Sequence, residues 1–317
     1  MDIYLPIAEI SINAIGLLAL GAVVGFLSGL FGVGGGFILT PLLTFMGVPP
    51  TIAVGTQANQ LAGTSLSGAL AAWKRRNIDI KMGTVLMLGS FLGTGLGVQI
   101  FSWLRQIGQI NLVIKLSYVT LLSFVGIMMM WESAPYLFKK VQRIRKTSSK
   151  PKELPKEEDD GPDLGWGAGS ALGMTFPVSN LRLNILLPLG IGFIGGVLVA
   201  LLGVGGGFVM VPAMIYILRM PPSLVSGTSL FQIVFTTGFA TIMQAVTNQS
   251  VDLVLALILL TGSVVAVPYG TRYASRLRPE IARFLMASLI LIVATKLIYD
   301  LLAQPNQLYF VEMRKII

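Results

Sequence analysis

A short glycine motif occurs twice in the chain, and its chemistry suits an anion. Gly-Val-Gly-Gly-Gly occupies residues 32–36 and 203–207. Three consecutive glycines disfavour a continuous helix, and a helix that begins after them presents backbone N–H groups at its positive dipole end. Close helix packing through small residues is the alternative. Because a tripled glycine precedes a short apolar segment in both halves, with no Lys-Ser/Thr of a nucleotide loop, the motif favours an anion site.

A stripe of neutral polar residues follows each motif, after the pairs Pro49-Pro50 and Pro221-Pro222. Such residues at helical spacing share one face and can hold an oxyanion without a fixed charge. The same residues could instead form hydrogen bonds between helices. The residues that we expect to bind the substrate are Gly34, Gly35, Gly36, Thr56, Gln57, Gln60, Gly205, Gly206, Gly207, Thr228, Ser229 and Gln232.

Few charged residues lie in or near the apolar runs. Lys115 and Lys296 either extend to the membrane interface or, for Lys115, pair with an anionic substrate. Asp79 and Asp252 lie at equivalent loop ends, where a role in helix capping is expected. The chain has no His and no Cys, so neither a metal site nor a cofactor is expected, and catalysis is disfavoured.

The composition indicates that membrane helices position these residues. Of 317 residues, 54% are hydrophobic and 12% charged, whereas soluble domains carry about 25% charged residues. Runs of about 20 apolar residues have the length that spans a bilayer. The sequence therefore predicts an all-α, polytopic helical membrane protein. The predicted runs are 12–31, 37–47, 53–72, 82–101, 110–131, 183–202, 208–218, 224–246, 252–270 and 281–303.

The two halves repeat each other, which predicts an internal duplication. The aligned pairs include Gly32 with Gly203, Pro41 with Pro212, Gly55 with Gly227, Thr56 with Thr228 and Gln60 with Gln232. We expect a first transmembrane repeat over residues 1–131, a charged cytoplasmic linker over 132–182 and a second transmembrane repeat over 183–317. The linker is rich in charge, Pro and Ser, and is expected to be solvated.

Basic charge changes sides between equivalent loops. The net charge of +9 is concentrated in the loop 73–81, the linker and the loop 271–283, while 102–110 and 247–251 are nearly free of cations. Cytoplasmic loops carry the excess of Lys and Arg, so the two copies should be inverted repeats with both termini external. At about 1.5 Å per residue, 37–47 and 208–218 are too short to cross a bilayer. They are either re-entrant, with glycines at their tips, or parts of distorted third crossings.

The repeated pattern of Gly-Val-Gly-Gly-Gly-Phe, a following Pro, Pro-Pro and Gly-Thr resembles the sulfite exporter TauE/SafE family, also called the TSUP family. The resemblance covers about 12–131 and 183–303. It implies a transporter of the bacterial or archaeal cell membrane for small sulfur-containing anions, such as sulfite or organosulfonates, usually in export. The second half has Thr228-Ser229 where the first has Thr56-Gln57, so the two half-sites differ chemically.

The favoured hypothesis is therefore a secondary carrier with alternating access. A passive anion channel, an uptake permease for another small organic anion, and a membrane enzyme or partner subunit are the alternatives. The expected partners are a small anionic substrate and the lipid bilayer, without nucleic acid; a homo-oligomer is left open.

Overall fold

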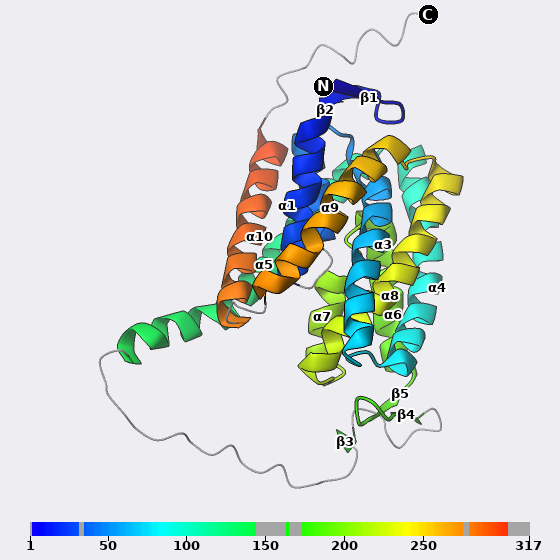
Figure 1. The fold of residues 1–317 in the computed structure, drawn as a ribbon. Helices are drawn as coiled ribbons and strands as arrows, with labels where there is room; N and C mark the ends of the chain where they lie inside the picture. The colour runs from blue at the N-terminus through cyan, green and yellow to red at the C-terminus, as the bar shows by residue number, and fades with distance from the viewer. Residues whose placement is uncertain (1, 32–34, 144–162, 165–172, 275–278, 304–317) are drawn as a thin grey trace, which may run out of the picture.

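The computed structural model describes residues 2–31, 35–143, 163–164, 173–274 and 279–303, most of them in helices (Figure 1). The first half contains β1 (Asp2–Leu5), β2 (Ile10–Asn13), α1 (Ala14–Phe31), α2 (Gly36–Phe45), α3 (Pro50–Lys74), α4 (Ile80–Gln106) and α5 (Ile110–Arg143). The second contains β3 (Asp163–Leu164), β4 (Gly173–Phe176), β5 (Leu181–Asn184), α6 (Leu186–Leu202), α7 (Gly207–Tyr216), α8 (Pro222–Met243), the π-helical segment η1 (Gln244–Asn248), α9 (Leu253–Ala274) and α10 (Pro279–Leu302).

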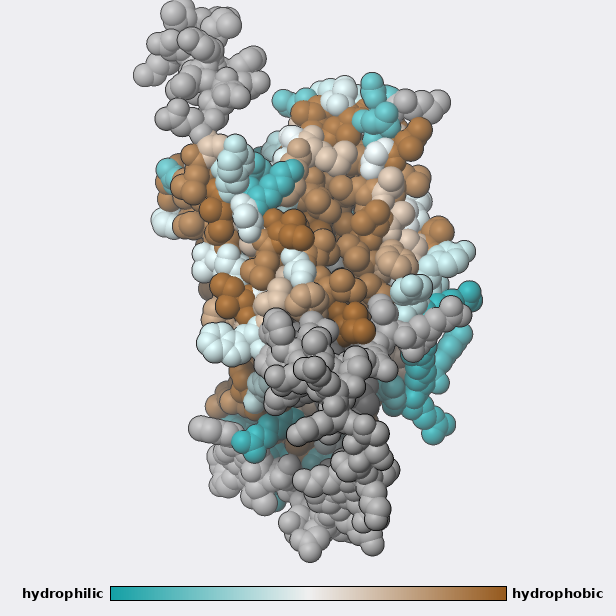
Figure 2. Space-filling model, turned by 90° about the vertical axis from the view of Figure 1, so that its left-hand side faces the viewer, coloured by the Kyte–Doolittle hydropathy of each residue, from teal (hydrophilic) through white to brown (hydrophobic). Residues whose placement is uncertain are grey.

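The predicted membrane helices are confirmed. Every predicted apolar run coincides with a helix, and within the described ranges six helices are long and apolar enough to cross a bilayer. Their outer faces carry large exposed apolar side chains, such as Leu92, Phe124 and Ile292. Figure 2 shows hydrophobic residues over the middle of one face, with hydrophilic ones gathered mostly toward its two ends. Exposed apolar area on this scale is typical of a surface in contact with lipid.

The starts of the central helices follow local chemistry. Pro50 is the first residue of α3 and Pro222 the first of α8, a position where the missing proline N–H costs nothing. The carboxylate of Asp79 accepts a hydrogen bond from the Met82 N–H at 3.0 Å, and that of Asp252 accepts from the Leu255 N–H at 3.1 Å. The capping role expected for these two aspartates is confirmed.

The short helices α2 and α7 are re-entrant, which decides between the two alternatives left by the sequence. The end of α2 packs with the start of α1, since Leu43 and Leu17 share one buried cluster with Leu5 of β1. In the second half, Met214 of α7 packs with Phe176 of β4, which precedes α6. Each short helix therefore returns toward the end of the molecule from which its preceding helix started.

The two halves interlock. Helix α1 packs along α9, while α6, which corresponds to α1, packs along α4, which corresponds to α9. The equivalent helices α3 and α8 pack against each other, as do α5 and α10 (Figure 1). The first helix of each half therefore packs against the fourth helix of the other half.

Short β-structure, which the sequence did not predict, precedes the first helix of each half. Strands β1 and β2 pair antiparallel at the upper end in Figure 1, and β4 and β5 pair antiparallel at the lower end, with β3 beside β5. The alternation of buried Leu181 and Leu183 with exposed Arg182 explains why β5 is a strand. Helix α5 continues to Arg143, and β3, β4 and the start of β5 lie before residue 183, so both ends of the stretch 132–182 that was predicted to be a solvated linker contain regular secondary structure.

The connections that carry basic residues lie at one end of the bundle. The α3–α4 connection, the end of α5 and the neighbouring ends of α9 and α10 all lie toward the lower end in Figure 1. The N-terminal hairpin and the end of α10 lie toward the upper end. The fold thus has one end rich in basic residues and one end poor in them.

Candidate functional site

Two glycine turns meet inside the bundle. The first glycine turn is the motif at residues 32–36, which connects α1 to α2 and is described at residues 35 and 36. The second glycine turn (203–207) joins α6 to α7. Gly34 lies outside the described residues, while Gly35 and Gly206 immediately precede α2 and α7 with φ of 65° and 70°. A Cβ on Gly36 would lie 2.5 Å from Leu61 Cδ1, and one on Gly205 would lie 2.9 Å from that same atom. Both turns therefore contact one leucine of α3, at distances that leave no room for a side chain.

Gln57 joins the two turns. This wholly buried side chain of α3 donates from Nε2 to the carbonyl oxygens of Gly36 and Gly203, each 2.5 Å away. Its Oε1 accepts a hydrogen bond from the hydroxyl of Thr40 on α2. Since Gly36 belongs to the first half and Gly203 to the second, one amide holds the two halves together at the glycine turns.

Gln60, one turn further along α3, is different. It is as deeply buried as Gln57, yet neither its Nε2 nor its Oε1 has a hydrogen-bond partner among the described residues. Burying an amide without partners costs about 1–3 kcal/mol. Its neighbour Leu61 contacts both glycine turns, and Gln57, which joins the turns, lies one helical turn earlier, so Gln60 belongs to the stretch of α3 that packs at the turns.

The polar stripe of α8 is partly satisfied. Gln232 donates from Nε2 to Ser90 Oγ of α4 at 2.6 Å and to Thr236 Oγ1 at 3.0 Å, but its buried Oε1 has no partner in the described part of the chain. Ser229, which aligns with Gln57, donates its hydroxyl to the Ser226 carbonyl of its own helix at 3.0 Å. The second half thus lacks the amide bridge that Gln57 makes in the first.

The hydroxyls of Thr56 and Thr228, which the sequence grouped with the site, accept hydrogen bonds at the starts of α9 and α4. The Thr56 hydroxyl accepts a hydrogen bond from the Asp252 N–H, and the Thr228 hydroxyl accepts one from the Asp79 N–H, each at 3.0 Å. The same aspartates accept hydrogen bonds from the hairpins: Asp252 from the Ile7 N–H at 3.0 Å and Asp79 from the Ser179 hydroxyl at 2.5 Å. In each half, threonine therefore holds the start of a helix that belongs to the other half.

Several polar contacts of the site were missed by sequence reasoning. Thr40 is the polar residue inside the otherwise apolar segment before Pro41, a signal that could have been used. Tyr118 of α5 donates its hydroxyl to the carbonyl of Leu202 at 2.5 Å. Leu202 is the residue immediately before the second glycine turn. Ser90 of α4 donates to the Gly192 carbonyl at 2.9 Å. Neither Tyr118 nor Ser90 carries a local sequence signal, because their partners lie far along the chain.

The site has donors and acceptors but no fixed charge. No group of three or more His, Cys, Asp and Glu side chains that could hold a metal ion occurs in the ranges that the structure describes. The buried polar side chains of this region are amides and hydroxyls, from Gln57, Gln60, Thr40 and Tyr118. A neutral, water-poor set of donors can bind an anion without a competing carboxylate.

Comparisons with known proteins agree with this architecture. Residues 17–297 match the family described as sulfite exporter TauE/SafE. A probable membrane transporter protein of Bacillus subtilis, YjnA, is 31% identical over 90% of this chain and 100% of its own length. A second, YunE, is 25% identical over 90% and 97%, and one from Xylella fastidiosa is 30% identical over 81% and 83%.

No solved structure matches the chain. The family match nevertheless spans both glycine turns and all the helices that carry the buried amides. Its extent confirms the resemblance drawn from the repeated glycine motif. This chain belongs to the sulfite exporter TauE/SafE family of membrane transporters.

Proposed function

We propose that this protein is a secondary transporter of small sulfur-containing anions, such as sulfite or organosulfonates. The family description supplies the substrate class, and the neutral donors around the glycine turns supply a compatible site. The anion binds beside Gln57 and Gln60 of α3, with Gln232 of α8 contributing from the second half. Transport needs no chemical step, and the amides and hydroxyls of the site are suited to binding rather than to catalysis.

The single observation that carries this proposal is the unpartnered amide of Gln60. A wholly buried side chain that satisfies neither its donor nor its acceptor lowers stability, so its presence calls for an explanation outside the protein's own hydrogen bonds. A bound oxyanion accepts from Nε2, and a protonated oxyanion or an accompanying water donates to Oε1.

The two halves are proposed to be inverted repeats of the cell membrane, with the basic end of the bundle in the cytoplasm. The exchange of helix partners between the halves and the hairpins at opposite ends support the inversion. In such transporters the binding site lies near the midplane and each repeat rocks against the other. We propose that such a motion is centred on the glycine turns, which Gln57 joins.

The function is tested by ligand binding and by counterflow. A ligand that binds only the native state at a hundred times its Kd adds about 2.7 kcal/mol of stability. We expect sulfite or an organosulfonate to raise the thermal unfolding midpoint of purified protein, while chloride at equal ionic strength does not. In proteoliposomes loaded with the same anion, labelled anion should accumulate by counterflow.

Conductance without saturation or counterflow would instead identify a passive channel. Absence of both stabilisation and flux across sulfite, thiosulfate, sulfoacetate, taurine and sulfate would reject the proposed substrate class. Each result separates the transporter proposal from one named alternative.

The inverted arrangement predicts opposite labelling of two equivalent loops. The chain has no cysteine, so single cysteines at Asn77 and Gln249 give clean signals. We expect an impermeant thiol reagent added outside intact cells to label Gln249→Cys but to label Asn77→Cys only after the membrane is opened. Labelling of both from the same side would contradict the inversion, whatever the substrate is.

A further inference from the structure

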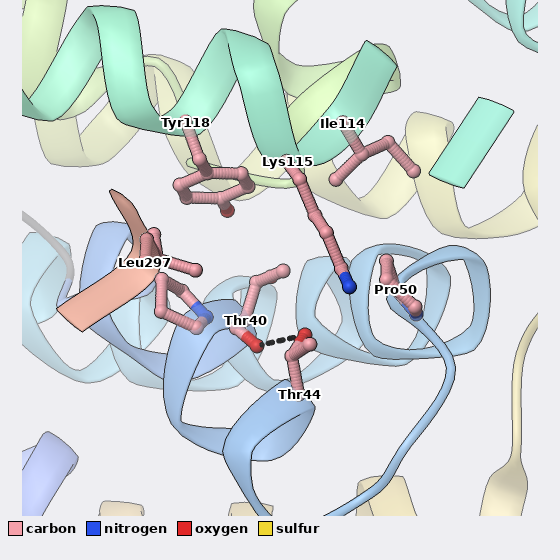
Figure 3. Close-up of a pocket in the computed structure, with 8 residues that line it drawn as sticks. Thr40, Thr44, Pro50, Ile114, Lys115, Tyr118 and Leu297 are labelled. Atoms are coloured by element: carbon pink, nitrogen blue, oxygen red, sulfur yellow. Dashed lines mark hydrogen bonds between the residues drawn. The ribbon is translucent and has the colours of Figure 1, made fainter. Parts of the chain in front are cut away.

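A small pocket with a lysine lies outside the glycine turns. Figure 3 shows the Lys115 side chain extending from α5 across this pocket toward Thr44 of α2 and Pro50 of α3. Its volume of about 10 Å³ leaves room for one water-sized group. The lining residues are Thr40, Pro41, Thr44, Pro50, Ile114, Lys115, Tyr118 and Leu297.

Among the polar side chains that line this pocket, Lys115 is the one whose donors are not used in a hydrogen bond between described residues. The Thr40 hydroxyl donates to Gln57, the Thr44 hydroxyl to the Thr40 carbonyl at 2.9 Å, and the Tyr118 hydroxyl to the Leu202 carbonyl. No carboxylate lines the pocket, and Lys115 makes no ion pair or hydrogen bond within the described residues. The Lys115 side chain is half-buried, and an ammonium without a counterion in a membrane helix is costly, a cost that a bound anion would offset.

The pocket lies toward the end of the bundle that is poor in basic residues. Lys115 is close to the start of α5, and Thr44 is close to the end of α2, which returns to the end where α1 begins. At the neighbouring end of α4, Arg105 donates to the Asn248 carbonyl of η1. Under the proposed topology, this is the external side of the membrane.

Two short routes of hydrogen bonds connect the pocket to the glycine turns. The first runs from Thr40 through Gln57 to the carbonyls of Gly36 and Gly203. The second runs from Tyr118 to Leu202, the residue before Gly203. One layer of side chains therefore separates the pocket from the proposed central site.

The second half has no matching set of hydroxyls. At the positions of α7 that correspond to Thr40 and Thr44, the chain has Val211 and Ile215. Lys115, Thr40 and Thr44 therefore meet at a pocket of the first half, and the described part of α7 has no hydroxyls at the equivalent positions.

We propose that Lys115, with Thr44, forms an external subsite for one oxygen of a sulfite or sulfonate anion on its way to or from the glycine turns. This inference rests on the proposed function for the substrate class. The subsite itself is electrostatic and short-range, so it is recognisable by any small sulfonate that can reach Thr44.

The test uses two reagents of opposite charge on the variant Thr44→Cys, in a chain that otherwise lacks cysteine. The reagents are the methanethiosulfonates that carry an ethylsulfonate or an ethyltrimethylammonium group, added to membranes with the external side exposed. We compare the rate of thiol modification by the anionic reagent with the rate by the cationic reagent. Changes in thiol exposure or thiolate fraction affect both rates equally and so leave their ratio unchanged. Adding Lys115→Met should lower this ratio by about tenfold, the order expected when a unit charge a few ångströms away is removed.

The matched controls are Lys115→Arg and Lys296→Met. Lys115→Arg keeps the charge and should keep the ratio. Lys296, exposed on α10 with its ammonium 3.9 Å from the centre of the Phe45 ring, is a second cation near position 44 but outside the pocket lining, and Lys296→Met should lower the ratio less than Lys115→Met does. An unchanged ratio in Lys115→Met, an equal fall in Lys296→Met, or a Thr44→Cys thiol that reacts with neither reagent would overturn the subsite. If the ratio falls further in Lys115→Met than in Lys296→Met, but sulfite and sulfonates never stabilise the protein, the subsite is upheld and the proposed transport substrate is rejected.

Discussion

Gly93→Ala is expected to separate α4 from α6 and to lower the thermal unfolding midpoint of the purified protein by about 6 °C or more. A Cβ at Gly93 would lie 2.0 Å from the backbone oxygen of Phe193 and 2.8 Å from its carbonyl carbon. No rotamer change can relieve a contact with backbone, so the helices themselves must move apart. Overpacking of this kind costs about 1–3 kcal/mol or more.

The effect should be large because this helix pair is held by glycines on both sides. A Cβ on Gly89 would lie 2.2 Å from the Leu189 carbonyl oxygen, and one on Gly196 would lie 2.1 Å from that of Ser90. Small residues spaced by four let membrane helices approach this closely. Ser90, which receives the hydrogen bond from Gln232, lies in the same contact, so separation of the helices also disturbs the polar stripe of α8.

Gly95→Ala is the matched control. Gly95 lies on the same helix, two residues away, and a Cβ there would meet nothing within 4 Å. Alanine should add about 1 kcal/mol of helix propensity at this position. Equal unfolding midpoints for Gly93→Ala and Gly95→Ala, measured in the same detergent, would show that the α4–α6 contact is not close-packed in solution.

The sequence predicts the helices well, because the bilayer sets their length and composition. Each predicted apolar run is a helix, and the glycine turns fall where the pattern breaks. The sequence could not predict the path of the short helices, because 11 apolar residues fit both a re-entrant segment and part of a crossing. Only the tertiary packing, which puts Leu43 in one buried cluster with Leu17 and Met214 in another with Phe176, decides between them.

The hairpins were missed although the sequence repeats them. Pro6 and Asn13 of the first hairpin correspond to Pro177 and Asn184 of the second, and the turns contain Glu9 and Asn180 with φ of 54° and 50°. Strands of four residues are too short for alternation to stand out beside membrane helices. Comparison of the two halves over the whole chain, rather than over the apolar runs alone, would have identified them.

The site illustrates a different limit of sequence reasoning. Gln57 and Gln60 look alike in the sequence, as amides one turn apart on one helix, and both were predicted to bind the substrate. In the structure Gln57 is fully used by Thr40, Gly36 and Gly203, while Gln60 is unpartnered. The difference depends on a contact between residues 57 and 203, which no local pattern reveals.

This difference leads to the sharpest prediction for function: Gln60→Met should stabilise the protein and abolish transport. Methionine has nearly the volume of glutamine and no group that needs a hydrogen bond. Removing a buried, unpartnered amide should therefore raise stability by about 1–3 kcal/mol. If the amide is kept to bind the anion, the same change removes the donor that the anion uses, and counterflow in proteoliposomes should fall to the level of empty liposomes.

Gln57→Met distinguishes this result from a general effect of losing a buried amide. It removes the donor to the Gly36 and Gly203 carbonyls and the acceptor for Thr40, so it should lower the unfolding midpoint. Opposite shifts in stability for two like substitutions, three residues apart, would separate an amide that holds the fold from an amide held for a ligand. A Gln60→Met protein that transports at the wild-type rate would exclude Gln60 from the anion site, and a less stable one would mean that its amide has a partner in the folded protein.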